Sequence, residues 1–202
     1  MGASPWIILF AVLLYGVIHS WLASHQAKAL AQRWFGKAAE RGYRLAYNLF
    51  AGITLLPVLA LPVLLPDRQI YALQAPWIYA ALIVQGLALI ALVIGLWQTG
   101  VWSFLGVEQL FQPQPNVNAK LVVRGLYRWV RHPLYTAGLA FIWFSPVMTA
   151  NLLALNLGLT AYILIGAQFE ERKLRREFGE AYAEYQRRTP MLVPDLRVRF
   201  KT

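Results

Sequence analysis

The sequence predicts an all-α integral membrane protein of about five transmembrane helices, the last two forming a helical hairpin that precedes a cytoplasmic C-terminal helix. Two observations predict this class. The 202-residue chain is 58% hydrophobic and has a mean hydropathy of +0.47, which is too apolar for a soluble domain of this size. Its charged residues also gather at the ends of long apolar segments, as in membrane-spanning chains.

Three apolar segments in the first half of the chain are long enough to cross a bilayer. The first covers residues 5–23, and the basic, amphipathic segment 25–44 connects it to the second. The second covers residues 43–65 and contains Pro57 and Pro62, at which we expect kinks. The third covers residues 77–97 between two tryptophans that are typical of interfacial anchors.

The second half of the chain begins with a long loop, residues 100–131, which includes the proline-containing stretch 112–116. An uncharged run from 133 to 169 then predicts the fourth and fifth helices, with a turn near its middle. A charged helix is expected over 170–188, with Phe178, Tyr182 and Tyr185 in one aromatic stripe. We expect the remaining tail, from residue 189, to be a surface strap.

The distribution of basic residues predicts the orientation. Of the nineteen Lys and Arg residues, all except Arg68 lie on the same side of a five-helix topology. The positive-inside rule then places the N-terminus outside and the C-terminus in the cytoplasm, as in a prokaryotic inner or plasma membrane. This partition, beside anionic lipid, argues against nucleic acid as the partner of a chain with net charge +10. The absence of cysteine and the three scattered histidines argue against a metal site.

The hairpin has polar groups at both of its ends. Arg131 and His132 precede it, and Glu170 and Glu171 follow it. Because a hairpin returns to the membrane face from which it started, we expect these four side chains to meet there. A cation, an imidazole and two carboxylates at that depth suggest a site where a charged, water-soluble ligand meets an apolar one.

These residues belong to a pattern that resembles the C-terminal half of the isoprenylcysteine carboxyl methyltransferase and phospholipid methyltransferase superfamily. The likeness covers roughly residues 120 to 194, and residues 149–192 also look like bacterial methanethiol S-methyltransferases. The matching positions are Leu121-Val122, Gly125, Tyr127, Arg131-His132-Pro133, Tyr135, Gly138, Glu170-Glu171, Phe178-Gly179, Tyr182, Tyr185, Pro190 and Pro194.

The resemblance implies a membrane-embedded methyltransferase that binds S-adenosylmethionine without a Rossmann domain. It divides the chain into a substrate-side region, 1–99, and a cofactor-binding region, 100–202. Arg131 and Glu171 are then expected to organise the reacting centre. The candidate cofactor-binding residues are Leu121, Val122, Gly125, Tyr127, His132, Tyr135, Gly138, Glu170, Tyr182 and Tyr185, and the candidate substrate-binding residues are Arg124, Trp102 and His19.

Several alternatives stay open at this point. The acceptor is an isoprenylcysteine-like carboxylate, a small thiol or a phospholipid amine, and a sterol-reductase-like enzyme using NADPH and a non-enzymatic membrane component are further readings. Arg124 and Arg131 also suit simple membrane anchors. The pair Glu170-Glu171 suits an ion pair with Arg175, and the aromatic stripe suits packing. The sequence defines neither the acceptor nor the oligomeric state.

Overall fold

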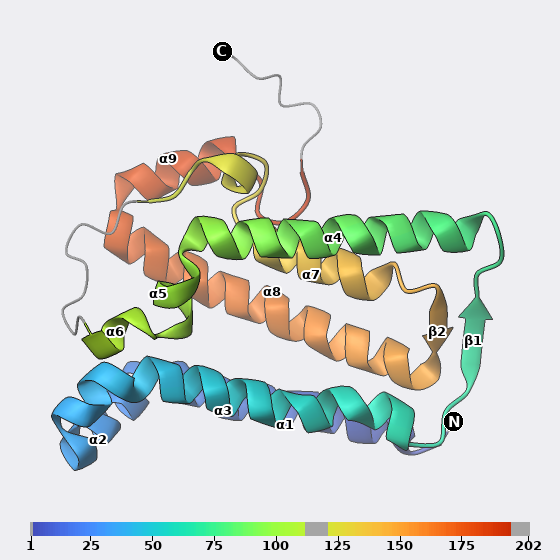
Figure 1. Cartoon of the computed structure of the whole chain (residues 1–202), viewed down its shortest axis with the longest axis horizontal. Coiled ribbons are helices and arrows are strands. Elements are labelled where there is room, and N and C mark those ends of the chain that lie inside the picture. The colour runs from blue at the N-terminus through green and yellow to red at the C-terminus, as the bar shows by residue number, and fades with distance from the viewer. Residues whose placement is uncertain (1, 112–120, 195–202) are drawn as a thin grey trace. The chain divides into compact units, whose positions relative to one another are not determined.

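The chain is mostly helical in a computed structural model that describes residues 2–111 and 121–194. Four helices in this part of the chain are long and apolar enough to cross a membrane (Figure 1). They are α1 (Ser4–Ala23), α3 (Lys37–Leu64), α4 (Trp77–Thr99) and α8 (Ala150–Phe178). Their many exposed apolar side chains suit contact with lipid tails. The prediction of a helical membrane protein is thereby confirmed, while residues 112–116 of the predicted loop lie outside the described residues.

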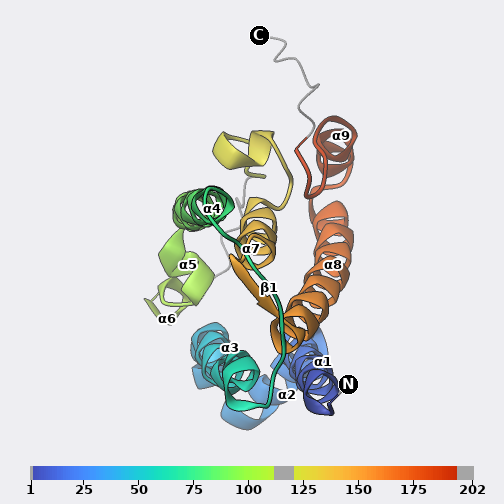
Figure 2. The same ribbon diagram turned by 90° about the vertical axis from the view of Figure 1, so that its right-hand side faces the viewer.

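The other elements are short and connect or follow these four helices (Figures 1 and 2). They are α2 (His25–Phe35), β1 (Gln69–Ala72), α5 (Val101–Leu105), α6 (Glu108–Phe111), the 3-10 helix η1 (Gly125–Arg128), α7 (Pro133–Trp143), β2 (Val147–Thr149) and α9 (Glu180–Arg188).

The structure corrects the prediction in three places. Two strands, β1 and β2, pair antiparallel across a bulge between Gln69 and Tyr71, and runs this short carry little sequence signal. The second long helix begins at Lys37, because α3 continues the basic connection without a break. The expected helix over 170–188 is divided at Gly179, whose φ of 54° ends α8 and starts α9, so Phe178 lies on a different helix from Tyr182 and Tyr185.

The described chain forms two compact units. Unit 1 comprises the described residues within Met1–Ala72, Gly100–Asn118 and Val147–Tyr162, and unit 2 comprises those within Leu73–Thr99, Ala119–Pro146 and Ile163–Thr202. Helix α8 therefore contributes its first half to unit 1 and its second half to unit 2. The functional division that we expect at residue 100 stays a prediction.

Unit 1 is built on the pairing of α1 with α3. Its core contains Ile8 and Val12 from α1, Val58 from α3, and Ala154 and Leu155 from α8. At one end of this unit the fully buried Asn151 side chain donates to the carbonyls of Leu65 and Pro66 at 3.3 and 3.2 Å. These bonds satisfy carbonyls at the C-terminal end of α3, which no helical turn follows.

The connection that contains α5 and α6 is fixed to α3 within unit 1. The Asn48 amide donates to the carbonyls of Phe104 and Leu105 at 3.0 and 2.9 Å. Gly106 then turns the chain with a φ of +93°, and a Cβ at this position would lie 2.5 Å from the backbone nitrogen of Leu45. Only glycine fits both this left-handed conformation and this close approach.

In unit 2, α4 and α7 lie side by side along their length (Figures 1 and 2). Gly95 allows this approach, since a Cβ there would stand 2.8 Å from the Leu134 side chain. Gln85 donates from α4 to the carbonyl of Phe141 at 2.9 Å. Near the other end of α4, the side-chain oxygen of Gln98 accepts from the Leu126 backbone N–H at 3.2 Å and holds η1.

We predict that Gly106→Ala destabilises the protein by roughly 1–3 kcal/mol, because alanine would have to adopt a left-handed backbone and push against α3. Gly52→Ala in α3 is the matched control, since a Cβ there meets nothing within 4 Å, and its free energy of unfolding should be unchanged or higher by up to about 1 kcal/mol. Denaturant unfolding of the purified protein, followed by circular dichroism, measures both. Equal stability of the two variants would contradict the assigned turn.

Candidate functional site

The centre of unit 2 is an ion pair between Arg131, which precedes α7, and Glu171 in α8. It is bidentate: the Arg131 Nε lies 2.6 Å from Oε1 of Glu171, and Nη2 lies 2.9 Å from Oε2. Both side chains are about 90% buried, with exposures of 11% and 10%. The planar guanidinium matches the two carboxylate oxygens, which makes this geometry among the strongest that an ion pair adopts.

Further donors occupy the remaining acceptor positions of Glu171. His132 Nε2 lies 3.0 Å from Oε1, the Tyr182 hydroxyl donates to Oε1 at 3.2 Å, and the Gln186 amide donates to Oε2 at 2.5 Å. With the two bonds from Arg131, five donor atoms surround a group that has about four lone-pair sites. The carboxylate of Glu171 is therefore fully engaged by the protein itself.

The segment after α9 secures the same arginine and histidine from the backbone side. The Arg131 and His132 backbone N–H groups donate to the carbonyls of Pro190 and Met191 at 2.9 and 3.1 Å. Arg131 Nη1 donates to the carbonyls of Gln186 and Thr189, at the C-terminal end of α9, where a cation is favoured. The described part of the predicted strap thus pairs directly with the start of α7.

Next to this closed cluster stands a carboxylate that is partly open. The Glu170 side chain is 44% exposed and accepts a hydrogen bond from the Tyr135 hydroxyl at 2.8 Å. The Tyr135 ring stacks on the His132 ring, with centroids 5.3 Å apart. His132 Nδ1 lies 3.7 Å from the Glu170 Oε2, too far for a hydrogen bond. Because the other ring nitrogen faces Glu171, a neutral His132 presents an acceptor here beside the carboxylate.

The comparisons with known proteins concern this region above all. The profile of the family described as Phospholipid methyltransferase matches residues 77–181, just over half of the chain. The chain belongs to this family. No solved structure matches it significantly.

The relatives extend this match to nearly the whole chain. Methanethiol S-methyltransferase of Mycobacterium tuberculosis is 31% identical over 96% of this chain and 80% of its own length. Methanethiol S-methyltransferase 2 of Bradyrhizobium diazoefficiens is 53% identical over 38% of this chain and 30% of its own. Protein-S-isoprenylcysteine O-methyltransferase of Xenopus laevis is 30% identical over 45% and 32%. The predicted class of enzyme, a methyltransferase, is confirmed.

Two of the candidate cofactor-binding residues, Tyr182 and Tyr185, are buried inside unit 2. Tyr182 is only 1% exposed, and its hydroxyl is committed to Glu171. Tyr185 is also buried, and its hydroxyl donates to the Tyr127 carbonyl at 2.6 Å. Burial raises the pKa of Tyr182, and the neighbouring Glu171 carboxylate raises it further, so this hydroxyl stays a donor. Both side chains therefore belong to the interior of unit 2.

The other candidates in unit 2 lie before and along α7. Arg124 is exposed directly before η1, and Gly125 begins η1 with a φ of 64°. Tyr127 is half-buried, and burial raises its pKa to about 12. A Cβ on Gly138 would meet nothing within 4 Å. Leu121 and Val122 are half-buried in the segment before η1.

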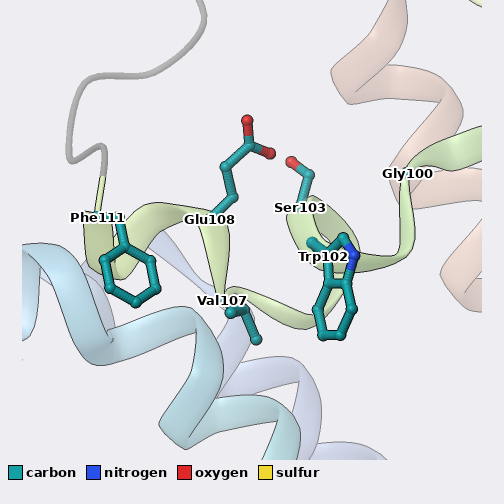
Figure 3. Close-up of a pocket in the computed structure, with 6 residues that line it drawn as sticks. All are labelled: Gly100, Trp102, Ser103, Val107, Glu108 and Phe111. Atoms are coloured by element: carbon teal, nitrogen blue, oxygen red, sulfur yellow. The ribbon is translucent and has the colours of Figure 1, made fainter.

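Trp102 and His19 belong to unit 1. Trp102 lies in α5 and lines a pocket of about 460 Å³ with Val107, Glu108, Phe111, Gly100 and Ser103 (Figure 3). His19 lies in α1 and contacts Tyr47. In the described part of the chain, no group of three or more His, Asp or Glu residues is placed to hold a metal ion.

The sequence argument missed Gln186, which completes the ring of donors around Glu171. Its spacing contains a signal, because position 186 is one helical turn after Tyr182 and shares its face. The carbonyls of Thr189, Pro190 and Met191 in the strap have no such signal in the sequence, since every residue has a carbonyl group.

We predict that Arg131→Met destabilises the protein by about 3–5 kcal/mol, because it leaves the buried carboxylate of Glu171 without its cation. Reversible denaturant unfolding in detergent measures this loss. The matched control is Arg124→Met, since that arginine is exposed, and it should change stability by less than about 1 kcal/mol. The double variant Arg131→Met/Glu171→Leu should be more stable than Arg131→Met alone, and additive losses would show that the two side chains do not act as a pair.

Proposed function

We propose that this phospholipid methyltransferase family member transfers the methyl group of S-adenosylmethionine to a small thiol at the membrane. The observation that carries the proposal is the pair of acceptors beside the closed cluster, Glu170 and the Nδ1 of His132. A carboxylate left partly open next to stacked rings suits a ligand with positive charge, and a sulfonium is such a ligand. The names of the relatives support the choice of a thiol.

The residues present fit this cofactor. Glu170, His132 and the ring of Tyr135 would hold its cationic part, and Arg124, with the turn at Gly125, would offer a cation for its carboxylate. Bound S-adenosylmethionine would supply an electrophilic methyl group on a positively charged sulfur. The chain's own task is to orient the two reactants and to exclude water. Leu121, Val122 and Gly138 are candidates for apolar contacts with the adenosine part.

We assign Arg131, Glu171, Tyr182 and Tyr185 to positioning and not to contact with the reactants. Every acceptor site of Glu171 is occupied, and the guanidinium of Arg131 donates to that carboxylate and to two backbone carbonyls. Their function is to fix His132 and, through the rigid start of α7, Tyr135. A preorganised site of this kind needs little rearrangement when a charged ligand arrives.

The proposal includes five membrane crossings with a cytoplasmic C-terminus. Helix α7 has 11 residues and is therefore about 16 Å long, roughly half of a hydrocarbon core. Between α7 and α8 the chain turns at residues 144–146 and then forms the extended strand β2, which rises by about 3.3 Å per residue and adds to the length of the segment. Pairing of β2 with β1 satisfies backbone groups of this extended part, as a membrane interior requires.

The proposed activity is tested by an acceptor screen. Detergent-purified protein is incubated with methyl-labelled S-adenosylmethionine and, in separate reactions, with methanethiol, ethanethiol, a farnesylated cysteine or phosphatidylethanolamine. We expect labelled thioether from the thiols and at least tenfold lower turnover of the other acceptors. Preferred labelling of the prenylcysteine or the aminolipid would replace the thiol by that acceptor, and S-adenosylmethionine that fails to bind at all would refute the methyltransferase assignment for this site.

We predict that Glu170→Gln weakens S-adenosylmethionine binding by about tenfold or more, because a charged hydrogen-bonding contact contributes about 1.5–3 kcal/mol. Isothermal titration calorimetry measures the dissociation constant. Glu177→Gln is the matched control, an exposed glutamate on the same helix, and should bind as wild type does. Stability should be equal in all three proteins, since glutamine still accepts the hydrogen bond from Tyr135. Unchanged affinity in Glu170→Gln would remove this carboxylate from the cofactor site.

A further inference from the structure

Unit 1 contains a second polar cluster, which lies entirely within predicted membrane-spanning helices. Its centre is His19, one helical turn before the end of α1. The Tyr47 hydroxyl of α3 lies 2.5 Å from the Nε2 of His19. Tyr15 stacks on the imidazole with ring centroids 5.4 Å apart, and Tyr162 of α8 meets it edge-on at 5.9 Å. Three helices therefore surround one imidazole with tyrosine rings.

The spacing of aromatic residues along the sequence accounts for this cluster. Tyr15 and His19 are four residues apart on α1 and therefore share one face of that helix. Tyr43 and Tyr47 are likewise four residues apart on α3 and share the face that meets α1. The Tyr43 hydroxyl donates to the carbonyl of Leu22 at 2.6 Å and aligns the two helices. Gly16 admits the third ring, because a Cβ there would lie 3.0 Å from Tyr162.

Counting donors shows that this cluster is incomplete. If the Tyr47 hydroxyl donates to Nε2, the proton of the neutral imidazole is on Nδ1, and that N–H has no partner among the described residues. If Nε2 donates instead, the Tyr47 O–H has none. Either way, the pair keeps one donor without a partner among the described residues, and the half-buried His19 leaves this donor open to a ligand. An ionisable residue within a membrane helix marks a functional site by default.

We propose that the His19–Tyr47 pair binds the sulfur of the thiol acceptor. A thiol or thiolate sulfur accepts the spare hydrogen bond, and sulfur also makes favourable contacts with aromatic ring edges, here those of Tyr15 and Tyr162. A small thiol is apolar enough to reach these helices through the membrane. The choice of a thiol as the ligand rests on the proposed function, whereas the presence of an unpartnered donor in the His19–Tyr47 pair is independent of it.

Another molecule with a hydrogen-bond acceptor is available to the same donor, namely the ester carbonyl of a membrane lipid. The ring environment suits the polarizable sulfur, which makes favourable contacts with aromatic side chains. The experiment therefore has to separate the two. The protein has only three histidines, so carbon-13 labelling of histidine gives a spectrum simple enough to follow each one by NMR.

In the test, labelled wild-type protein in lipid nanodiscs is titrated with ethanethiol, without any methyl donor. His19→Asn and His25→Asn assign the signals, and exposed His25 on α2 is the internal control. We expect a saturable shift of the His19 signal and none at His25. A His19 signal that does not move overturns the proposal, as does one that moves only when ester-linked lipids replace ether-linked ones.

A kinetic measurement provides an independent test. Tyr47→Phe should raise the KM for ethanethiol by about tenfold and leave the dissociation constant of S-adenosylmethionine unchanged. The control is Tyr79→Phe, an exposed tyrosine on α4, which should alter neither. A purely structural role of Tyr47 would change stability and both constants together, and that result would overturn the assignment. If the NMR shift occurs but no thiol is methylated, the proposed function fails while the binding site stands.

Discussion

The bidentate ion pair between Arg131 and Glu171 is the interaction on which unit 2 depends. It joins Arg131, two residues before α7, to the charged end of α8, and these two places are 40 positions apart in the sequence. Burying two charges is costly, and the geometry offsets this cost only because His132, Tyr182 and Gln186 complete the ring of donors. The strap after α9 extends the same network to the backbone of Arg131 and His132. Removing any one member therefore leaves a buried polar group of another member without its hydrogen-bond partner, which destabilises the fold.

Much of this arrangement was predictable because few physical choices were available. An uncharged run longer than 30 residues with polar ends has to fold back in a membrane, which brings His132 to Glu171. The family pattern added Tyr182 and Tyr185 but not their orientation. These two tyrosines face inward because the chain breaks at Gly179 and α9 turns back over the site. A single glycine in a charged segment is not enough to predict a positive φ from the sequence.

The sequence could not specify contacts that depend on tertiary placement of common groups. The carbonyls of Thr189, Pro190 and Met191 are chemically the same as any others, yet they fix the two central residues of the site. The pairing of β1 with β2 is similar, since strands of three or four residues are defined by their partner and not by periodicity. Helix existence was set by local composition, whereas helix ends and donor networks were set by neighbours distant in sequence.

Glu170 and Glu171 show how adjacent identical residues acquire different roles. Successive positions on an α-helix point about 100° apart, so one carboxylate faces the interior and the other its edge. The inner one is saturated and holds the framework, while the outer one keeps 44% of its side chain exposed and accepts a hydrogen bond from Tyr135. A site for a cationic ligand requires a negative charge that is both fixed in place and incompletely satisfied. The buried glutamate fixes the position, and its neighbour retains the charge that a ligand can still meet.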